Sequence, residues 1–240
     1  MIGCDCAVCR SEDPRDNRLR SSVYIETPEC AFVVDTGTDF RTQALRENIR
    51  RVDAVVFTHS HTDHIMGFDD LRRYSWERGS MPVYASRDTM ADLARVYAFA
   101  FEATNPFPGY LKPEPNIVDG AFQLGETTVT PLPVPHGRAP VNGYLFSREK
   151  RKLLAYLSDC SEVPDPIAEQ IAGVEALVID ALRPKPHPTH LSVEQALEAA
   201  RRVRPGRTYF THIAHELSAA AEAELPANTF MAYDGLKLEF

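Results

Sequence analysis

Three histidines and an aspartate stand within six residues in the first third of the chain. The segment reads His59-Ser60-His61-Thr62-Asp63-His64 and directly follows an apolar stretch at 53–57, which predicts a short buried strand. A loop at a strand end can direct several side chains to one point, because the sheet fixes the base of the loop. Imidazole and carboxylate groups together suit Zn, Mn or Fe. The spacing therefore predicts a metal site.

Further candidate ligands stand at the carboxyl ends of other predicted strands. The strands expected at 127–134, 152–157 and 207–210 are each followed within two residues by one of them: His136, Asp159 and His212. Together with the motif at 59–64 they make seven candidate ligands, which is enough for two metal ions.

A second cluster lies at the start of the chain, where Cys4-Asp5-Cys6-Ala7-Val8-Cys9 has the spacing C-x-C-x-x-C. It lacks a fourth ligand, and His215, three residues after His212, is the candidate. A closed Cys₃His set is a usual structural zinc site. The alternative is that the three cysteines are free thiols in a mobile terminus.

A third candidate segment runs from residue 180 to residue 192 and contains two basic side chains, Arg183 and Lys185. Ser192 and Gln195 form a capping box that predicts a helix at 193–203. His190 therefore stands just before a helix N-terminus, which favours an anionic ligand. The same field disfavours imidazolium, so a neutral hydrogen-bond donor is the alternative state of this histidine. Arg183 and Lys185 either neutralise a phosphate or are solvated loop charges.

The elements that must position these residues are strands in clusters with helices between them. A hairpin is expected at 23–35 and a loop or lid at 103–115. Further strands are expected at 143–146 and 176–179, with two short ones closing the chain, and helices at 39–50, 88–101, 165–171 and 217–225. This order indicates packed sheets covered by helices.

Composition restricts the function further. The chain has 240 residues, of which 44% are hydrophobic and 25% charged, with a formal net charge of −8. This is a globular composition, and we expect a single domain over 1–240. The acidic balance argues against wrapping duplex nucleic acid. We find no membrane span or signal peptide, and the crowded cysteines fit a reducing compartment, so we expect the cytoplasm.

In order and spacing, this ligand set resembles that of the metallo-β-lactamase superfamily in its phosphodiesterase branch, over essentially the whole chain. The resemblance implies an α/β (α+β) fold, the αββα sandwich. It assigns His59, His61 and His136 to one metal ion, Asp63, His64 and His212 to a second, and Asp159 to both. Aspartate rather than cysteine as the shared ligand speaks against a β-lactamase. Asp35, in the D-x-G turn of the superfamily, is expected to brace the ligand loop.

The cysteine spacing, together with Thr211-His212-Ile213-Ala214-His215, resembles the PhnP-like proteins, the phosphoribosyl cyclic phosphate phosphodiesterases. This resemblance implies a structural zinc on Cys4, Cys6, Cys9 and His215. It also implies that His190 protonates the leaving oxygen, that Asp63 hydrogen-bonds the nucleophile, and that the chain forms a homodimer. Related chains usually begin with a further strand before the cysteines, so we expect the sandwich to lack that strand, by truncation or by true absence.

The sequence is therefore interpreted as a dinuclear metal-dependent phosphodiesterase. It would hydrolyse a small cyclic or nucleotide-type phosphodiester by attack of a hydroxide held between two divalent ions, Mn or Zn. Three alternatives stay open: a nuclease or tRNA-processing phosphodiesterase, a lactonase or thioesterase of the same superfamily, and a non-catalytic metal-binding module.

Overall fold

The computed structural model describes residues 1–76, 78–102, 107 and 109–240. Contacts divide the chain into two compact units. The first unit is Arg20–Glu126, and the second unit combines Met1–Leu19 with Thr127–Phe240. Within the described residues, no helix has the length and apolar character that a membrane crossing requires.

The first unit is built on a sheet with the strand order β1-β2-β3-β4-β5, in which β1 and β2 are antiparallel and the remaining neighbours are parallel. The strands of this sheet are β1 (Val23–Glu26), β2 (Ala31–Val34), β3 (Ala54–Val56), β4 (Met81–Ala85) and β5 (Pro113–Ile117), and the unit also contains β6 (Phe122–Leu124), which is not a strand of this sheet. Its helices are α1 (Phe40–Arg46), α2 (Thr62–Ile65), α3 (Arg72–Ser75), α4 (Arg87–Val96) and α5 (Ala98–Phe101), with a 3₁₀ turn η2 (Phe68–Leu71).

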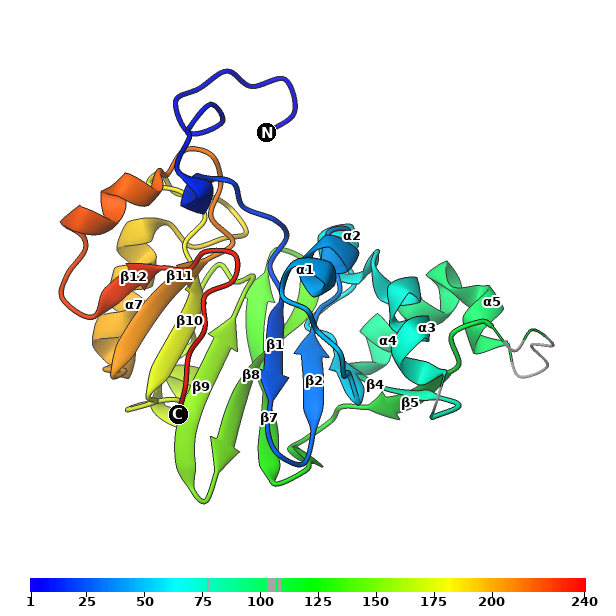
Figure 1. The fold of residues 1–240 in the computed structure, drawn as a ribbon. Coiled ribbons are helices and arrows are strands. Elements are labelled where there is room, and N and C mark those ends of the chain that lie inside the picture. The colour runs from blue at the N-terminus through cyan, green and yellow to red at the C-terminus, as the bar shows by residue number, and fades with distance from the viewer. Residues whose placement is uncertain (77, 103–106, 108) are drawn as a thin grey trace. The chain divides into compact units, whose positions relative to one another are not determined.

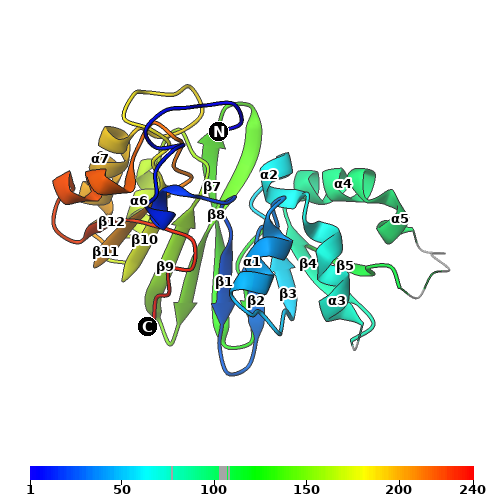
Figure 2. The same ribbon diagram turned by 45° about the horizontal axis from the view of Figure 1, so that its top comes forward.

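One face of this sheet forms the core of the first unit. Alternate strand residues such as Val33, Val55 and Val83 are buried in one cluster with Phe68 of η2 and Leu93 of α4. Because side chains alternate between the two faces of a strand, only every second residue of these strands can join this cluster, and this pattern fixes the register of the sheet. Figure 2 shows the helices of the unit gathered beside strands β2 to β4.

The second unit has a sheet with the strand order β12-β11-β10-β9-β8-β7, in which β9 to β12 are parallel and β8 is antiparallel to both of its neighbours. Its strands are β7 (Thr127–His136), β8 (Ala139–Arg148), β9 (Arg151–Leu157), β10 (Ala176–Asp180), β11 (Arg207–Thr211) and β12 (Thr229–Met231). Its helices are α6 (Asp165–Gln170) and α7 (Val193–Val203), with 3₁₀ turns η1 (Pro14–Asp16) and η3 (Ala219–Glu224).

Helices α6 and α7 pack on one face of this sheet, and α7 runs alongside β10 and β11 (Figure 1). Ala196 and Val203 of α7 are buried with Ile179 and Phe210 of the strands. The predicted capping box is present, since Ser192 Oγ accepts from the Gln195 N–H and the Gln195 side chain accepts from the Ser192 N–H. The start of α7 is therefore fixed by its own sequence.

The predicted fold class, α/β with helices covering sheets, is confirmed, and most predicted elements are present within two residues of their expected bounds. The first strand among the described residues is β1, part of the predicted hairpin with β2. Several interpretations were wrong in detail, among them the strand expected at 143–146, which is β8 and runs from Ala139 to Arg148. The helix expected at 39–50 ends at Arg46, because Asn48 takes a positive φ of 53° and turns the chain. The helix expected at 88–101 breaks at Tyr97 into α4 and α5.

Two further corrections concern the end of the chain. The helix expected at 217–225 is the 3₁₀ segment η3, and a single strand, β12, is found among the described residues after it where two were expected. The loop or lid expected at 103–115 falls partly outside the described residues, and residues 113–115 belong to β5.

Gly37 allows the turn after β2 to lie against the histidine motif. A Cβ at this position would overlap the backbone carbonyl oxygen of Asp63, whereas a Cβ on Gly120 would meet nothing within 4 Å. We expect Gly37→Ala to lower the free energy of unfolding by about 1–3 kcal/mol, because backbone atoms must shift to admit the methyl group. Urea unfolding measures the change. Gly120→Ala is the matched control, and equal midpoints for the two variants would contradict the prediction.

Candidate metal centre

The histidine motif of the first unit lies at the carboxyl edge of its parallel strands. β2 and β3 are neighbours in parallel register, with Val34 opposite Val56, so the residues that follow both strands lie at one edge. Asp35 directly follows β2, and His59 comes three residues after the end of β3. The sheet thus brings Asp35 and His59 to the same edge although they are far apart in the sequence, as the strand-end pattern predicted.

Asp35 is the buried anchor of this edge. Its carboxylate accepts hydrogen bonds from the Thr58 N–H and Thr58 Oγ1, each at 2.8 Å, and from His64 Nδ1 at 2.8 Å. Burial raises the pKa of Asp35, and its contacts with His64 and Thr58 oppose that shift. The predicted bracing role of Asp35 agrees with these contacts, which satisfy a fully buried carboxylate.

The same network sets which ring nitrogens can bind a metal. Since Asp35 accepts from His64 Nδ1, the Nε2 atom of His64 is the one suited to a cation. Thr58 Oγ1 donates to Asp35, so it accepts from His59 Nδ1 at 3.0 Å, which leaves His59 Nε2 in the same role. Thr58 is a residue whose part in the site the sequence did not reveal.

The four motif side chains converge within the first unit. The ring centroid of His59 lies 4.5 Å from that of His61 and 4.3 Å from that of His64. His64 Nε2 is 3.9 Å from Asp63 Oδ2, a separation compatible with two ligands of one ion. Arg20 Nη1 lies 3.7 Å from the same carboxylate oxygen, so Asp63 is also paired with a cation of the chain.

The second unit gathers its candidate ligands at an equivalent edge. β9, β10 and β11 are parallel neighbours, and β7 runs in the same direction because β8 is antiparallel to both β7 and β9. The side chains at or just after the carboxyl ends of these four strands are His136, Asp159, Asp180 and His212.

Asp159 lies between two of these histidines. Its Oδ2 atom is 3.7 Å from His136 Nε2 and 3.5 Å from His212 Nε2. These are the separations expected of ligands about 2.1 Å from a shared ion. The backbone carbonyl of Thr189 accepts from His136 Nδ1 at 2.8 Å and so directs Nε2 of His136 toward Asp159.

His190 also lies in this group. Asp159, His190 and His212 offer ligand atoms that all lie within 4.8 Å of one another. The His190 and His212 rings are stacked, with centroids 4.8 Å apart. His190 Nδ1 donates to Asp180 Oδ2 at 2.7 Å, which leaves Nε2 as the working atom of the ring.

Asp180 was not assigned a role from the sequence. It is fully buried, and burial raises its pKa well above the usual value, while the nearby His212 opposes the shift. Its Oδ2 atom also accepts from the Cys160 N–H. The signal was present, because an acid that ends the apolar strand Ala-Leu-Val-Ile-Asp must be buried with a partner.

The two basic residues considered for phosphate binding have different surroundings. Arg183 donates to the carbonyl oxygens of Lys185 and Pro186 and pairs with Glu216. Lys185 is exposed. His187 Nδ1 accepts from Thr189 N and interacts with Thr189 Oγ1, and the His187 ring centroid lies 5.1 Å from that of His190.

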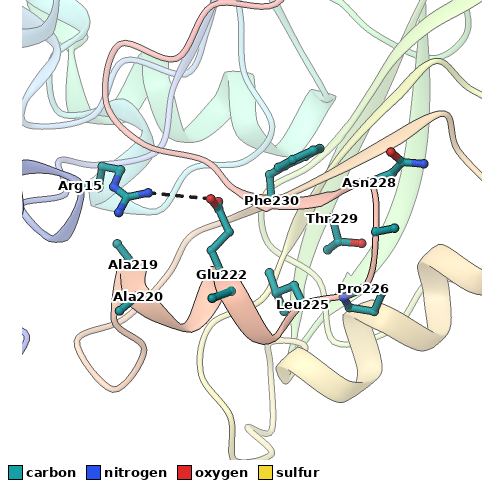
Figure 3. Close-up of a pocket in the computed structure, with 11 residues that line it drawn as sticks. Arg15, Ala219, Ala220, Glu222, Leu225, Pro226, Asn228, Thr229 and Phe230 are labelled. Carbon is teal, nitrogen blue, oxygen red and sulfur yellow. Dashed lines mark ion pairs between the residues drawn. The ribbon is translucent and has the colours of Figure 1, made fainter.

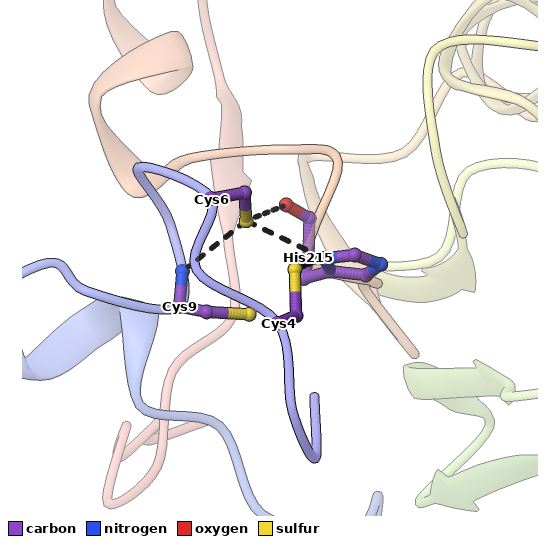
Figure 4. Close-up of side chains that lie close together, drawn as sticks. All are labelled: Cys4, Cys6, Cys9 and His215. Carbon is purple, nitrogen blue, oxygen red and sulfur yellow. Dashed lines mark hydrogen bonds between the residues drawn. The ribbon is translucent and has the colours of Figure 1, made fainter.

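The cysteine cluster of the second unit is assembled as predicted, with Cys4, Cys6, Cys9 and His215 pointing toward one another (Figure 4). His215 Nδ1 lies 3.4 Å from both Cys4 Sγ and Cys6 Sγ. A tetrahedral zinc ion would hold sulfur and nitrogen ligands about 3.6 Å apart, so the donor set fits. The Cys9 N–H and then His215 lower the pKa of Cys6 to about 6, which favours the thiolate that zinc binds.

A separate pocket of about 410 Å³ lies in the second unit between η3 and β12. Arg15 and Glu222 face each other across it at 3.8 Å, and Phe230 forms one wall (Figure 3). Glu222 also accepts from the Met231 N–H at 2.6 Å. Glu222 thus connects η3 both to β12 and, through Arg15, to η1.

The sequence matches the family described as the Beta-lactamase superfamily domain over residues 31–213. The chain belongs to the metallo-β-lactamase superfamily. A crystal structure described as a new diphosphatase from the PhnP family superposes with a TM-score of 0.91 at 41% identity, covering 100% of this chain and 91% of that one. The chain is therefore a member of the PhnP-like branch, as its motifs indicated.

Two curated proteins are also similar to this chain in sequence. An octanoyltransferase of Porphyromonas gingivalis is 35% identical over 98% of this chain and 48% of its own length. An exodeoxyribonuclease, YycJ, of Bacillus anthracis is 28% identical over 66% of this chain and 57% of its own length. This chain thus spans about half the length of the curated relatives that it matches.

Replacing the buried carboxylate behind His64 should weaken metal binding. Asp35 has a φ of 62°, a conformation that asparagine also tolerates, so Asp35→Asn changes the charge with little backbone strain. We expect a loss of roughly 10- to 100-fold in metal affinity, measured by competition with a chromogenic chelator. Asp88→Asn, an exposed change on α4, is the control. Equal affinities for the two variants would show that Asp35 does not orient a ligand.

Removing one cysteine should abolish the Cys₃His site alone. We expect Cys6→Ser to lose one zinc ion per chain and to melt at a lower temperature, because the N-terminal segment is no longer fixed to His215. Inductively coupled plasma mass spectrometry counts the metal, and Cys30→Ala, a change at a buried cysteine outside the cluster, provides the comparison. Unchanged zinc content in Cys6→Ser would refute the structural site.

Proposed function

We propose that this chain is a dinuclear metal-dependent phosphodiesterase that hydrolyses a small cyclic or nucleotide-type phosphodiester. Its two units would then act as one catalytic domain over 1–240. This proposal is supported by membership of the superfamily, since the family match at 31–213 takes in both histidine groups. It is also supported by the chemistry of each group, in which hydrogen bonds to Nδ1 direct Nε2 toward a cation.

The proposed ligand sets follow from the two groups. His59, His61 and His136 would hold one ion, and Asp63, His64 and His212 the other. Asp159 would be shared, in keeping with the similar distances from its Oδ2 atom to His136 and His212. Two divalent cations of the Mn or Zn type lower the pKa of a bound water and offset charge on a phosphoryl group.

The observation that carries the phosphodiester proposal is the Asp180–His190 pair beside Asp159 and His212. A diester with an alkoxide leaving group needs a proton at the leaving oxygen, and a positioned imidazole delivers one. Asp180 holds the ring by Nδ1 at 2.7 Å and stabilises the positive charge of the doubly protonated ring, whose Nε2–H is the proton to be given. His190 is thus proposed as the general acid. Asp63, 26% exposed and paired with Arg20, is proposed to orient the attacking water by accepting a hydrogen bond from it.

A second candidate substrate is a diphosphate, because the PhnP-family structure at 41% identity is described as a diphosphatase. The two candidates differ in the leaving group. A phosphate leaving group is a weak base and departs without protonation, whereas an alkoxide requires it. Dependence on His190 therefore distinguishes them.

Three other activities are less well supported. A nuclease is suggested by the exodeoxyribonuclease relative, but a net charge of −8 is unfavourable for a long polyanion. A lactone also expels an alkoxide, so the Asp180–His190 pair would serve its hydrolysis too, and a phosphorus centre is preferred because the PhnP-family structure at 41% identity is described as a diphosphatase. A non-catalytic module would have no need of the Asp180–His190 pair.

The remaining properties are proposed on the same basis. The Cys₃His cluster is proposed to bind a structural zinc ion, and its thiolates need a reducing compartment such as the cytoplasm. A homodimer, implied by resemblance to the PhnP-like proteins, is part of the same proposal.

A substrate panel tests the function. Protein reconstituted separately with Mn²⁺ and Zn²⁺ would be assayed on phosphoribosyl cyclic phosphate, a 2′,3′-cyclic nucleotide, bis(4-nitrophenyl) phosphate, a dinucleoside diphosphate, short RNA and a lactone. We expect the cyclic diesters to be cleaved with the highest kcat/KM. Efficient lactone turnover without diester cleavage would overturn the proposal.

The role of His190 is tested on the same panel. We expect His190→Ala to lower kcat by roughly 10²–10⁴-fold for alkoxide leaving groups and by much less for 4-nitrophenolate, with metal content unchanged. Glu194→Ala, an exposed change on α7, is the comparison. Equal losses on alkyl and aryl esters would remove the acid role from His190.

A further inference from the structure

The segment 183–189, here called the acid loop, carries His190 at its end and is fixed at its base. Leu182 N donates to Leu191 O, and Val193 N donates to Arg183 O. The loop base is also tied to the segment that follows β11 and contains His212, since Ala214 N donates to Leu182 O at 2.8 Å. The base is therefore rigid, whereas the tip, residues 184–188, needs another constraint.

Arg183 supplies that constraint from inside the loop. Its Nε donates to Lys185 O at 3.3 Å and its Nη2 donates to Pro186 O at 3.0 Å. Its third nitrogen, Nη1, lies 3.5 Å from Glu216 Oε1. The guanidinium fork is thus directed at the loop backbone and at one carboxylate.

The constraint continues from the tip to the site. The Thr189 N–H donates to His187 Nδ1, which closes the last turn of the loop. Thr189 O accepts from His136 Nδ1 at 2.8 Å, and the next residue is His190. The bond to buried His136 holds Thr189 O, so a shift of the tip is expected to change the placement of the His190 ring and not that of His136.

Glu216 connects the acid loop to the cysteine cluster. Its Oε1 faces Arg183, and its Oε2 lies 3.8 Å from His215 Nε2. His215 uses Nδ1 toward the cysteines, so its Nε2–H is directed to Glu216. Cysteine cluster, Glu216 and Arg183 form one chain of contacts within the second unit.

We propose that Arg183 is a positioning residue, which with Glu216 clamps the acid loop to the His215 segment and sets the placement of His190, and does not bind the substrate phosphate. The proposal rests on the proposed phosphodiesterase function. Exposed ion pairs contribute little to stability, so the effect is expected in the geometry of the loop and not in unfolding. A small misplacement of a catalytic group is sufficient to slow a reaction strongly.

The test compares Arg183→Lys, Glu216→Gln and their double variant, with Arg202→Lys as the matched control. Arg202 makes the same kind of contact, to Val163 O and Asp165, away from the loop. Lysine keeps the charge but not the fork. For the alkyl diester that the wild-type protein cleaves, we expect kcat to fall by about 10- to 100-fold in both single variants, with KM changed less than about threefold.

Three further results are expected from the clamp. The double variant should be no slower than either single variant, because both break one contact chain. Cleavage of bis(4-nitrophenyl) phosphate and the bound metal should stay near the wild-type values. Amide hydrogen exchange over 183–191 should rise about tenfold in both variants and not in Arg202→Lys.

A phosphate-binding Arg183 gives the opposite pattern, which would overturn the inference. In Arg183→Ala, KM would rise for alkyl and aryl esters alike. In Arg183→Lys, which keeps the positive charge, KM would return toward the wild-type value. Glu216→Gln, by removing a negative charge, would leave KM unchanged or lower it. If the wild-type protein cleaves no diester, the proposed function fails, and hydrogen exchange alone then decides whether the clamp exists.

Discussion

The arrangement of both histidine groups depends on one type of contact, a buried acceptor behind an imidazole. Asp35 accepts from His64, Asp180 accepts from His190, and the Thr189 carbonyl accepts from His136. Each contact fixes the tautomer of a ring and turns its Nε2 atom toward the group of candidate metal ligands. Without these hydrogen bonds, each imidazole could rotate and present either nitrogen, and the candidate ligand atoms would not point to one position.

Buried carboxylates are stable in these positions because other donors share them. Desolvation raises the pKa of Asp35 and of Asp180, which favours the protonated form of each carboxylate. Thr58 and His64 oppose this shift at Asp35, and His212 opposes it at Asp180. Cations bound nearby would act in the same direction, so metal binding and carboxylate ionisation are expected to support each other.

The sequence was sufficient to predict much of this arrangement. Candidate ligands followed predicted strands, and parallel strands bring their carboxyl ends to one edge, so the histidines had to converge within each sheet. The capping box at Ser192 was equally local, and helix α7 begins where it predicts. Such features depend on neighbouring residues or on a general property of sheets, and both can be read from a single chain.

Other features depend on contacts between distant segments and were not predicted. Arg183 was expected either to neutralise a phosphate or to be a solvated loop charge, and the sequence did not reveal its contacts with two carbonyls of its own loop and with Glu216, 33 residues away. Asp180 was visible as an acid ending an apolar strand, but its partner His190 depends on how the loop folds back. The break at Tyr97 has a similar origin, since its hydroxyl donates to the carbonyl of Ile65 in another segment.

Positive φ angles occur at two residues of the histidine groups as well as at helix ends. Among the described non-glycine residues with positive φ, Asn48 and Arg204 lie at helix ends, where such angles are common. Asp35 and His212 differ, because both follow strands that run into a site. A left-handed residue costs roughly 1–2 kcal/mol, and at these two positions it redirects the chain so that a carboxylate or an imidazole faces the ligand group. The strain at Asp35 is offset by three hydrogen bonds to its carboxylate, so orientation of the site and stability of the strand end are provided by the same contacts.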